Sequence, residues 1–179
     1  MKILLIFVFA IGLILPSSTF ALVEESELIK LANAERSNNG LASLEYNTTL
    51  QKAAQMKAND MAKRGYFSHR TPDGKTPWYF FDQVGYGYRY AGENLAVNFF
   101  DSKEIALAWM NSPTHRANIL KKNFTQIGIG VAYGIFQGKN TVFVAEFFGT
   151  PALSAKTITK QKIKAKKTPQ VLRRKIVAY

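Results

Sequence analysis

Residues 126–135 read QIGIGVAYGI and residues 141–148 read TVFVAEFF, and these two stretches decide the fold. Both are apolar and rich in β-branched or aromatic residues, which is typical of strands. Only residues 136–140 (FQGKN) separate them, and this short link containing a glycine predicts an antiparallel hairpin. Because apolar residues follow one another without alternation, we expect both faces of the hairpin to be buried. The predicted core positions are Ile127, Ile129 and Val131 on one strand, across from Val142, Val144 and Phe147.

Helical patterns precede the hairpin and can cover it. Residues 24–37 carry apolar side chains mostly on one helical face, and a second helix is expected after a cap at Asn47 or Thr48 and runs to about residue 63. A short helix is expected to begin at Thr76-Pro77 and to run to Gln83, with a further helix after Asp101 and another from 113 to about 120. A sheet that needs cover on both faces, with at least four helices available, predicts an α+β fold. We expect a three-layer α/β/α sandwich around a mostly antiparallel sheet.

Residues 1–21 have the pattern of a secretory signal peptide. Met1-Lys2 provides a positive start, residues 3–15 are an apolar run broken only by Gly12, and Thr19 and Ala21 form a small-x-Ala site. The alternative is an uncleaved anchor, but thirteen residues reach only about 20 Å of a roughly 30 Å hydrocarbon core. We therefore expect cleavage after Ala21, a folded domain over residues 22–153, and a protein that is secreted or periplasmic.

The positive charge is concentrated at the C-terminal end. The chain of 179 residues has a formal net charge of +12, and residues 154–179 hold nine of its 24 Lys and Arg and none of its 12 acidic residues. Such a block usually stays solvated and serves as an interaction tail. We expect a disordered tail that binds anionic cell-envelope polymers or lipids by charge, with no specific nucleic-acid partner. A solubilising tail without a partner is the alternative.

Four motifs occur in a fixed order within the expected domain. They are GYFSH at residues 65–69, GENL at 92–95, WMNSPTHRANIL at 109–120 and NFTQIGIG at 123–130. Together they resemble the bacterial branch of the CAP superfamily, the SCP-like extracellular domain, over roughly residues 28–149. That superfamily groups cysteine-rich secretory proteins, insect venom antigens and plant pathogenesis-related proteins. The resemblance implies an α/β/α sandwich with a cleft built around His and Glu side chains.

The resemblance assigns candidate cleft residues one by one. His69 and Glu93 match the first cleft histidine and the first cleft glutamate of the family. Asn123, in the Asn-Phe-Thr-Gln stretch that ends at Gln126, stands where eukaryotic members have their second histidine. The second glutamate of those members falls near Asn111 and Ser112 here, so two of four cleft positions differ. The expected ligand-binding residues are His69, Glu93, His115, Asn123 and Gln126, with His115 of the Ser-Pro-Thr-His-Arg motif as the source of a second imidazole.

Metal binding is one interpretation of this set of residues. The chain has no cysteine, so it has no thiol nucleophile and no disulfide, and any metal must be held by His, Asp or Glu. Two imidazoles and a carboxylate, as in His69, His115 and Glu93, match the ligands of many open zinc sites. The alternative is that His69 hydrogen-bonds Glu93 without a metal, while His115 caps or packs the start of its helix. A divalent cation such as zinc is the only cofactor that the sequence indicates.

Two classes of function remain in competition. The first is a secreted binding module whose cleft holds a small ligand, a lipid or a divalent cation. The second is a secreted metal-assisted hydrolase acting on wall polymer or peptide. Ser68 and His69 are a poor candidate for a pair of nucleophile and general base, because neighbouring residues in an extended chain point their side chains apart. The sequence therefore assigns no catalytic residue and favours a binding module.

The aromatic cluster at residues 78–81 is interpreted as a short helix packing on the core rather than as a ligand groove.

Deletion of residues 154–179 is expected to leave the domain folded and to abolish retention on cell envelopes. The full-length protein should be released from envelopes as salt is raised, because the Debye length falls from about 30 Å at 0.01 M to about 8 Å at 0.15 M. Sedimentation of both proteins with isolated envelopes measures this. A truncated protein that sediments as fully as the intact one would show that the tail is not the anchor.

Overall fold

The computed structural model describes residues 23–152, so the predicted signal peptide (1–21) and the basic tail (154–179) lie outside the described residues. The helices in this range are α1 (Glu25–Asn38), α2 (Thr48–Arg64), α3 (Trp78–Gln83), α4 (Ser102–Asn111) and α5 (Pro113–Ile119). The strands are β1 (Glu45–Tyr46), β2 (Tyr88–Val97), β3 (Gln126–Phe136) and β4 (Lys139–Pro151). Within residues 23–152, none of the helices is both long enough and apolar enough to cross a membrane.

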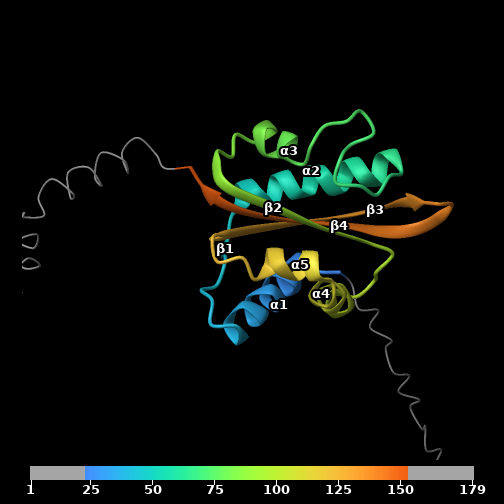
Figure 1. Ribbon diagram of the computed structural model, residues 1–179. Helices are drawn as coiled ribbons and strands as arrows, with labels where there is room; N and C mark the ends of the chain where they lie inside the picture. The colour runs from blue at the N-terminus through green and yellow to red at the C-terminus, as the bar shows by residue number, and fades with distance from the viewer. Residues whose placement is uncertain (1–22, 153–179) are drawn as a thin grey trace, which may run out of the picture.

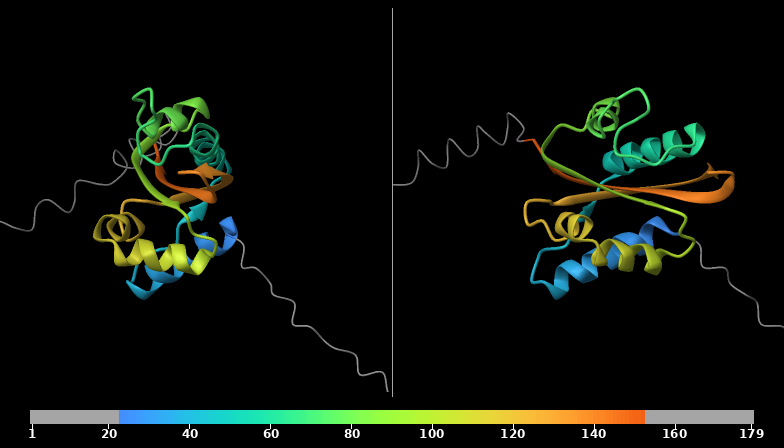
Figure 2. Two further views of the ribbon diagram at one scale, coloured as in Figure 1. Left: turned by 90° about the vertical axis from the view of Figure 1, so that its right-hand side faces the viewer. Right: turned by 45° about the vertical axis from the view of Figure 1, so that its right-hand side comes forward.

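The elements form three layers with the sheet in the middle (Figure 1). The strand order is β1-β3-β4-β2, with β1 parallel to β3 and the other neighbours antiparallel. Helices α2 and α3 cover one face, and α1, α4 and α5 cover the other, which the turned views in Figure 2 also show. The predicted α/β/α sandwich with a mostly antiparallel sheet is confirmed.

The β3–β4 hairpin is longer than predicted and turns at Gln137 and Gly138. Both turn residues have positive φ, which matches the twist that two-residue hairpins require. Ile127, Ile129, Val142 and Val144 share the face covered by α1, α4 and α5, as expected. Phe147 lies on the opposite face of the sheet, which α2 covers. Side chains alternate along a strand, and Phe147 is an odd number of residues from Val142 and Val144, as its neighbours Phe143 and Ala145 on that same face show. Phe147 is nevertheless a buried core position of the same strand as Val142 and Val144, as predicted.

Capping side chains mark the first turns of α2 and α4, two of the helices that cover the sheet. The Asn47 side chain accepts hydrogen bonds from the backbone N–H groups of Thr49 and Leu50, so Asn47 rather than Thr48 is the N-cap of α2. Asp101 accepts in the same way from Lys103 and Glu104 at the start of α4. Gly65 ends α2 in the left-handed conformation at φ 65°, which a residue without Cβ adopts at little cost.

Helix α2 lies directly on the backbone of β3 where that strand has glycines. A Cβ on Gly128 would overlap the backbone of Gln51, and a Cβ on Gly130 would overlap the backbone at Ala54 and Gln55. Gln55 then reaches the strand edge, where its side chain accepts from the Val131 N–H at 3.2 Å and donates to the Val131 carbonyl at 2.7 Å. The glycines thus determine how closely α2 approaches the sheet.

A buried arginine joins α1 to the segment between α5 and β3. The Arg36 guanidinium donates to the carbonyl oxygens of Ala42, Ile119, Lys121 and Phe124 at 2.8 to 3.4 Å. Its side chain is 2% exposed, so these bonds replace the water that burial removes. The hydrogen bonds of Arg36 hold the C-terminal end of α5 against α1 and thereby position α5 beside the sheet.

Gly130→Ala is expected to destabilise the fold by roughly 1–3 kcal/mol or more, because the added methyl must push α2 away from β3. Gly87→Ala is the matched control, since a Cβ at Gly87 meets only the Ala152 Cβ at 3.9 Å. Urea unfolding of both variants and the wild type measures the difference. Equal midpoints for the two variants would contradict the close packing of α2 on β3.

Candidate functional site

A cleft with a volume of about 420 Å³ lies along strand β2, which forms an edge of the sheet. Its walls come from the loop after α2, the start of α3, strand β2 and helix α5. The lining residues are His69, Arg70, Thr76, Pro77, Trp78, Ala91, Gly92, Glu93 and Asn118. The cleft therefore combines an aromatic side chain and backbone of β2 with a histidine, a glutamate and an amide.

His69 and Glu93 meet in this cleft as predicted. The His69 Nδ1 atom lies 2.7 Å from Glu93 Oε2. The histidine side chain is 58% exposed and the glutamate side chain is 3% exposed. The carboxylate is thus covered by protein, while the imidazole that it orients faces the cleft. Glu93 Oε1 is buried and has no hydrogen-bond partner among the described residues.

The electrostatics of the pair follow from this difference in burial. The hydrogen bond to Glu93 raises the pKa of His69 above its ordinary value, against the opposing effect of desolvation. Burial raises the pKa of Glu93, although the hydrogen bond from His69 and the charge of Lys57 oppose that shift. Each of the two groups therefore keeps its proton to a higher pH than it would in isolation.

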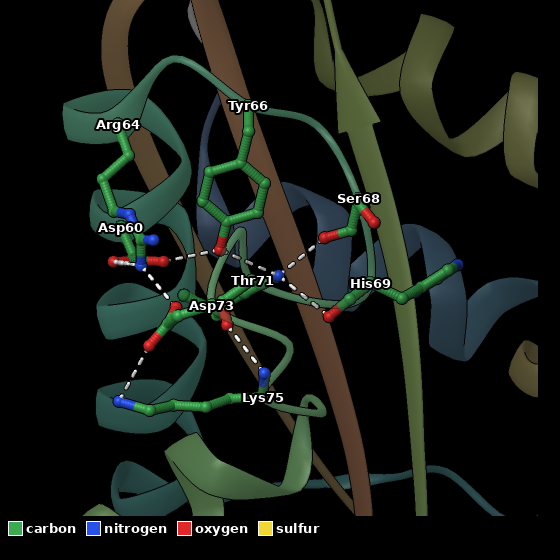
Figure 3. Close-up of polar contacts among 9 residues, drawn as sticks. Asp60, Arg64, Tyr66, Ser68, His69, Thr71, Asp73 and Lys75 are labelled. Atoms are coloured by element: carbon green, nitrogen blue, oxygen red, sulfur yellow. Dashed lines mark hydrogen bonds and ion pairs between the residues drawn. The ribbon is translucent and has the colours of Figure 1, made fainter.

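Polar contacts fasten the loop that carries His69 to helix α2 (Figure 3). Tyr66 donates its hydroxyl hydrogen bond to Asp60 Oδ2 at 2.5 Å. Arg64 Nη1 lies 2.9 Å from Asp73 Oδ1, and Lys75 Nζ lies 3.2 Å from Asp73 Oδ2. The loop of residues 66–75 is thus attached to α2 at two separate points.

A chain of hydrogen bonds runs from the amide of Asn118 on α5 through Asn94 on β2 to the buried acid Glu146 on β4. Asn118 Nδ2 donates to the Glu93 carbonyl at 3.1 Å and to Asn94 Oδ1 at 3.0 Å. Asn94 Nδ2 donates to Glu146 Oε2 at 2.9 Å and to the His115 carbonyl at 3.2 Å. Glu146 is 0% exposed, and burial raises its pKa to about 8. This network ties α5 to β2 and β4 beneath the cleft.

The other three predicted site residues do not line the cleft. His115 is half-buried at the start of α5, and burial followed by the charge of His69 lowers its pKa. Asn123 is exposed, and its carbonyl accepts a hydrogen bond from the Thr150 hydroxyl. Gln126 Oε1 accepts from the Tyr86 hydroxyl at 2.7 Å and from Asn47 at 3.2 Å. Gln126 therefore joins α2, β3 and the loop before β2 rather than meeting a ligand.

The donor set for a divalent cation is incomplete in this arrangement. Over residues 23–152 no group of three or more His, Asp or Glu side chains has the arrangement of a metal site. His69 and Glu93 are paired through Nδ1, and His115 does not join them among the cleft-lining residues. The three-residue zinc set expected from the sequence is therefore not assembled by the fold, and zinc binding stays a prediction.

Three residues of the site were missed at the level of the sequence. Trp78 lines the cleft, although Phe80 and Phe81 of the same aromatic cluster pack in the core as expected. Glu146 is an acid inside the apolar run TVFVAEFF, and that position was a signal of a buried carboxyl group. Asn118 belongs to the motif at residues 109–120, but nothing in its spacing indicates contact with Glu93.

The fold and the paired His69 and Glu93 define a three-layer domain of the SCP-like class. The family model described as CAP, the cysteine-rich secretory protein family, matches residues 29–147. The chain therefore belongs to the CAP family, although it contains no cysteine.

Relatives and solved structures agree with this family. The chain is 38% identical over 134 residues to the YkwD protein of Bacillus subtilis, covering 75% of this chain and 49% of that protein. It is 30% identical to an extracellular protein containing an SCP domain from Bacillus anthracis, with a TM-score of 0.60, covering 70% of this chain and 39% of that one. An outer surface protein from Borrelia burgdorferi shares the fold at 23% identity and a TM-score of 0.61, covering 71% of this chain and 92% of that one. The chain spans about half the length of YkwD and less of the Bacillus anthracis protein.

Glu146→Gln is expected to remove part of the pH dependence of stability. The folded protein binds the Glu146 proton more tightly than the unfolded chain, whose glutamates titrate near pH 4.5. The resulting stabilisation is fully present below pH 4.5 and is lost as the pH rises through about 8. The free energy of unfolding of the wild type should therefore fall, relative to that of the variant, by up to about 1.4 kcal/mol per pH unit in this interval. Urea unfolding between pH 4 and 9 measures the difference, and parallel curves would contradict it.

Proposed function

We propose that this protein is an extracellular binding module whose cleft holds a small organic ligand with a polar group and a flat apolar body. One observation carries the proposal: a buried carboxylate, Glu93, orients the exposed imidazole of His69 beside Trp78. Binding clefts characteristically combine an apolar or aromatic lining with a few fixed polar groups that determine orientation.

The polar end of the ligand would meet His69. Because Nδ1 is engaged with Glu93, Nε2 is the nitrogen that remains for a ligand. Nε2 accepts a hydrogen bond from a hydroxyl group when the ring is neutral and donates to an oxygen when the ring is protonated. Glu93 reduces the rotational freedom of the ring, so less entropy is lost when a ligand binds.

The apolar body of the ligand would lie against Trp78. Trp78 is fixed by edge contact with Phe81 at a centroid distance of 5.5 Å and by a tilted contact with Tyr88 at 5.8 Å. Pro77 and Ala91 extend this apolar wall. An indole face held in this way offers a platform for a sugar ring or a short acyl chain.

The hydrolase alternative receives less support from the same residues. A metal-assisted reaction needs an open metal site with about three protein ligands, and the described part of the chain offers the cleft one imidazole paired with one carboxylate.

The extracellular and outer-surface descriptions of the solved relatives support the extracellular location within the proposal. Retention at an anionic envelope by residues 154–179 belongs to the proposal as well.

Tryptophan fluorescence of the purified protein tests the proposal with three probes: N-acetylglucosamine, octanoate below its micellar concentration, and zinc chloride. The chain has two tryptophans, and Trp109 is 3% exposed with its indole N–H donated to the Leu95 carbonyl. Trp78 therefore reports on the cleft. We expect the sugar or the fatty acid to change the emission saturably, and the change to disappear in Trp78→Phe.

His69→Ala should weaken that binding roughly tenfold or more, as expected for the loss of one oriented hydrogen bond. Arg89→Gln is a matched control, since Arg89 is exposed on β2 outside the cleft lining. Saturable binding of zinc alone, with wall hydrolysis that depends on it, would favour the hydrolase. Absence of binding by both organic probes would contradict the proposal.

A further inference from the structure

Lys57 is a buried cation that the proposed ligand contacts do not use. It lies in the middle of α2, and it is 0% exposed. Burying an ammonium group is costly unless hydrogen bonds replace its water, so a fully buried lysine calls for a structural or functional reason. The reason is visible in what its nitrogen contacts.

All three hydrogen bonds of Lys57 go to the loop that carries His69. Lys57 Nζ donates to the Ser68 carbonyl at 2.7 Å, to the His69 carbonyl at 3.1 Å and to the Tyr66 hydroxyl at 3.2 Å. An ammonium group has three hydrogens, so its donors are fully used. Figure 3 shows the Ser68 and His69 carbonyls turned towards the same point between the loop and α2.

Charged and aromatic groups of α2, α3, β2 and the loop after α2 surround this nitrogen. Burial lowers the pKa of Lys57, while the charges of Glu93 on β2 and Asp60 on α2 raise it and that of Arg64 lowers it. The nitrogen also lies 4.9 Å from the ring centre of Tyr66 and 5.6 Å from that of Phe80. Lys57 forms no ion pair with Glu93 in the described structure, so its direct contacts are with the loop backbone.

We propose that Lys57 is the positioning residue of the cleft: by binding the carbonyls of Ser68 and His69, it holds the His69 imidazole in contact with Glu93. The role of this positioning in ligand binding rests on the proposed function, whereas the contacts of Lys57 with the loop do not depend on it. The loop has no regular hydrogen bonding of its own at residues 66–69, and the imidazole is largely exposed. By fixing the carbonyls of Ser68 and His69, Lys57 therefore fixes the backbone from which the imidazole extends.

The competing explanation is that Lys57 merely attaches the loop, as Arg64 does through Asp73. The two roles differ in what they affect. Arg64 and Asp73 join the outer part of the loop at a surface ion pair, whereas Lys57 binds the residue that carries the imidazole. Arg64→Gln is thus a matched control that loosens the loop and leaves the Lys57 contacts in place.

Proton NMR of the intact protein without ligand provides the test. A short hydrogen bond from His69 Nδ1–H to Glu93 shifts this proton downfield and slows its exchange, and His69→Gln assigns the signal. We expect the signal to be lost in Lys57→Met, retained in Arg64→Gln, and restored at least partly in Lys57→Arg, which returns a cationic donor. The affinity for the organic probe that binds the wild type should fall roughly tenfold or more in Lys57→Met and stay within about twofold in Arg64→Gln.

Retention of the downfield signal in a folded Lys57→Met protein would overturn the proposal, as would its equal loss in Arg64→Gln. If neither Lys57→Met nor Lys57→Arg folds, Lys57 acts in folding and the positioning role is likewise overturned. The signal is measured without ligand, so this result is independent of the proposed function. A wild type that binds no probe but loses its signal in Lys57→Met would keep the positioning role while contradicting the binding function.

Discussion

Helix α2 rests on the bare backbone of β3, and the remainder of the site depends on this contact. Gly128 and Gly130 leave no side chain between the two elements, so α2 approaches the sheet more closely than a helix on a normal strand face. Lys57 of this helix is buried, and its nitrogen reaches the loop beyond the end of the same helix. The helix that packs on Gly128 and Gly130 is thus also the helix that binds the His69 loop.

The layers contribute unequal parts of the cleft. The α2–α3 layer provides the histidine loop and Trp78, the sheet provides Glu93, and α5 of the other layer provides Asn118. Asn118 reaches the Glu93 carbonyl because α5 passes the edge of the sheet that β2 forms. A cleft assembled from all three layers needs each of them in place, which links ligand binding to the integrity of the fold.

Buried polar groups hold this domain together, and with no cysteine in the chain no disulfide contributes. Arg36 joins α1 to the end of α5, Lys57 joins α2 to the loop, and Asn94 joins β2 to Glu146. Each group is satisfied mainly by backbone carbonyls or by amides, whose dipoles compensate for the loss of water. Removing one partner would leave the other buried without a hydrogen bond, so these contacts are specific as well as stabilising.

The sequence by itself determined the hairpin, the helices, the layers and the family, whereas strands β1 and β2 appeared only in the structure. Apolar runs with turn residues between them predict the hairpin, caps at Asn47 and Asp101 mark helix starts, and four motifs in order indicate the CAP family. His69 and Glu93 were also predicted, because each lies within one of those motifs. Only the tertiary structure decided that His115, Asn123 and Gln126 lie outside the cleft and that Trp78, Asn118 and Lys57 serve it. The physical reason is that a motif records which residues are present, whereas contact across layers depends on how closely α2 and α5 pack against the sheet.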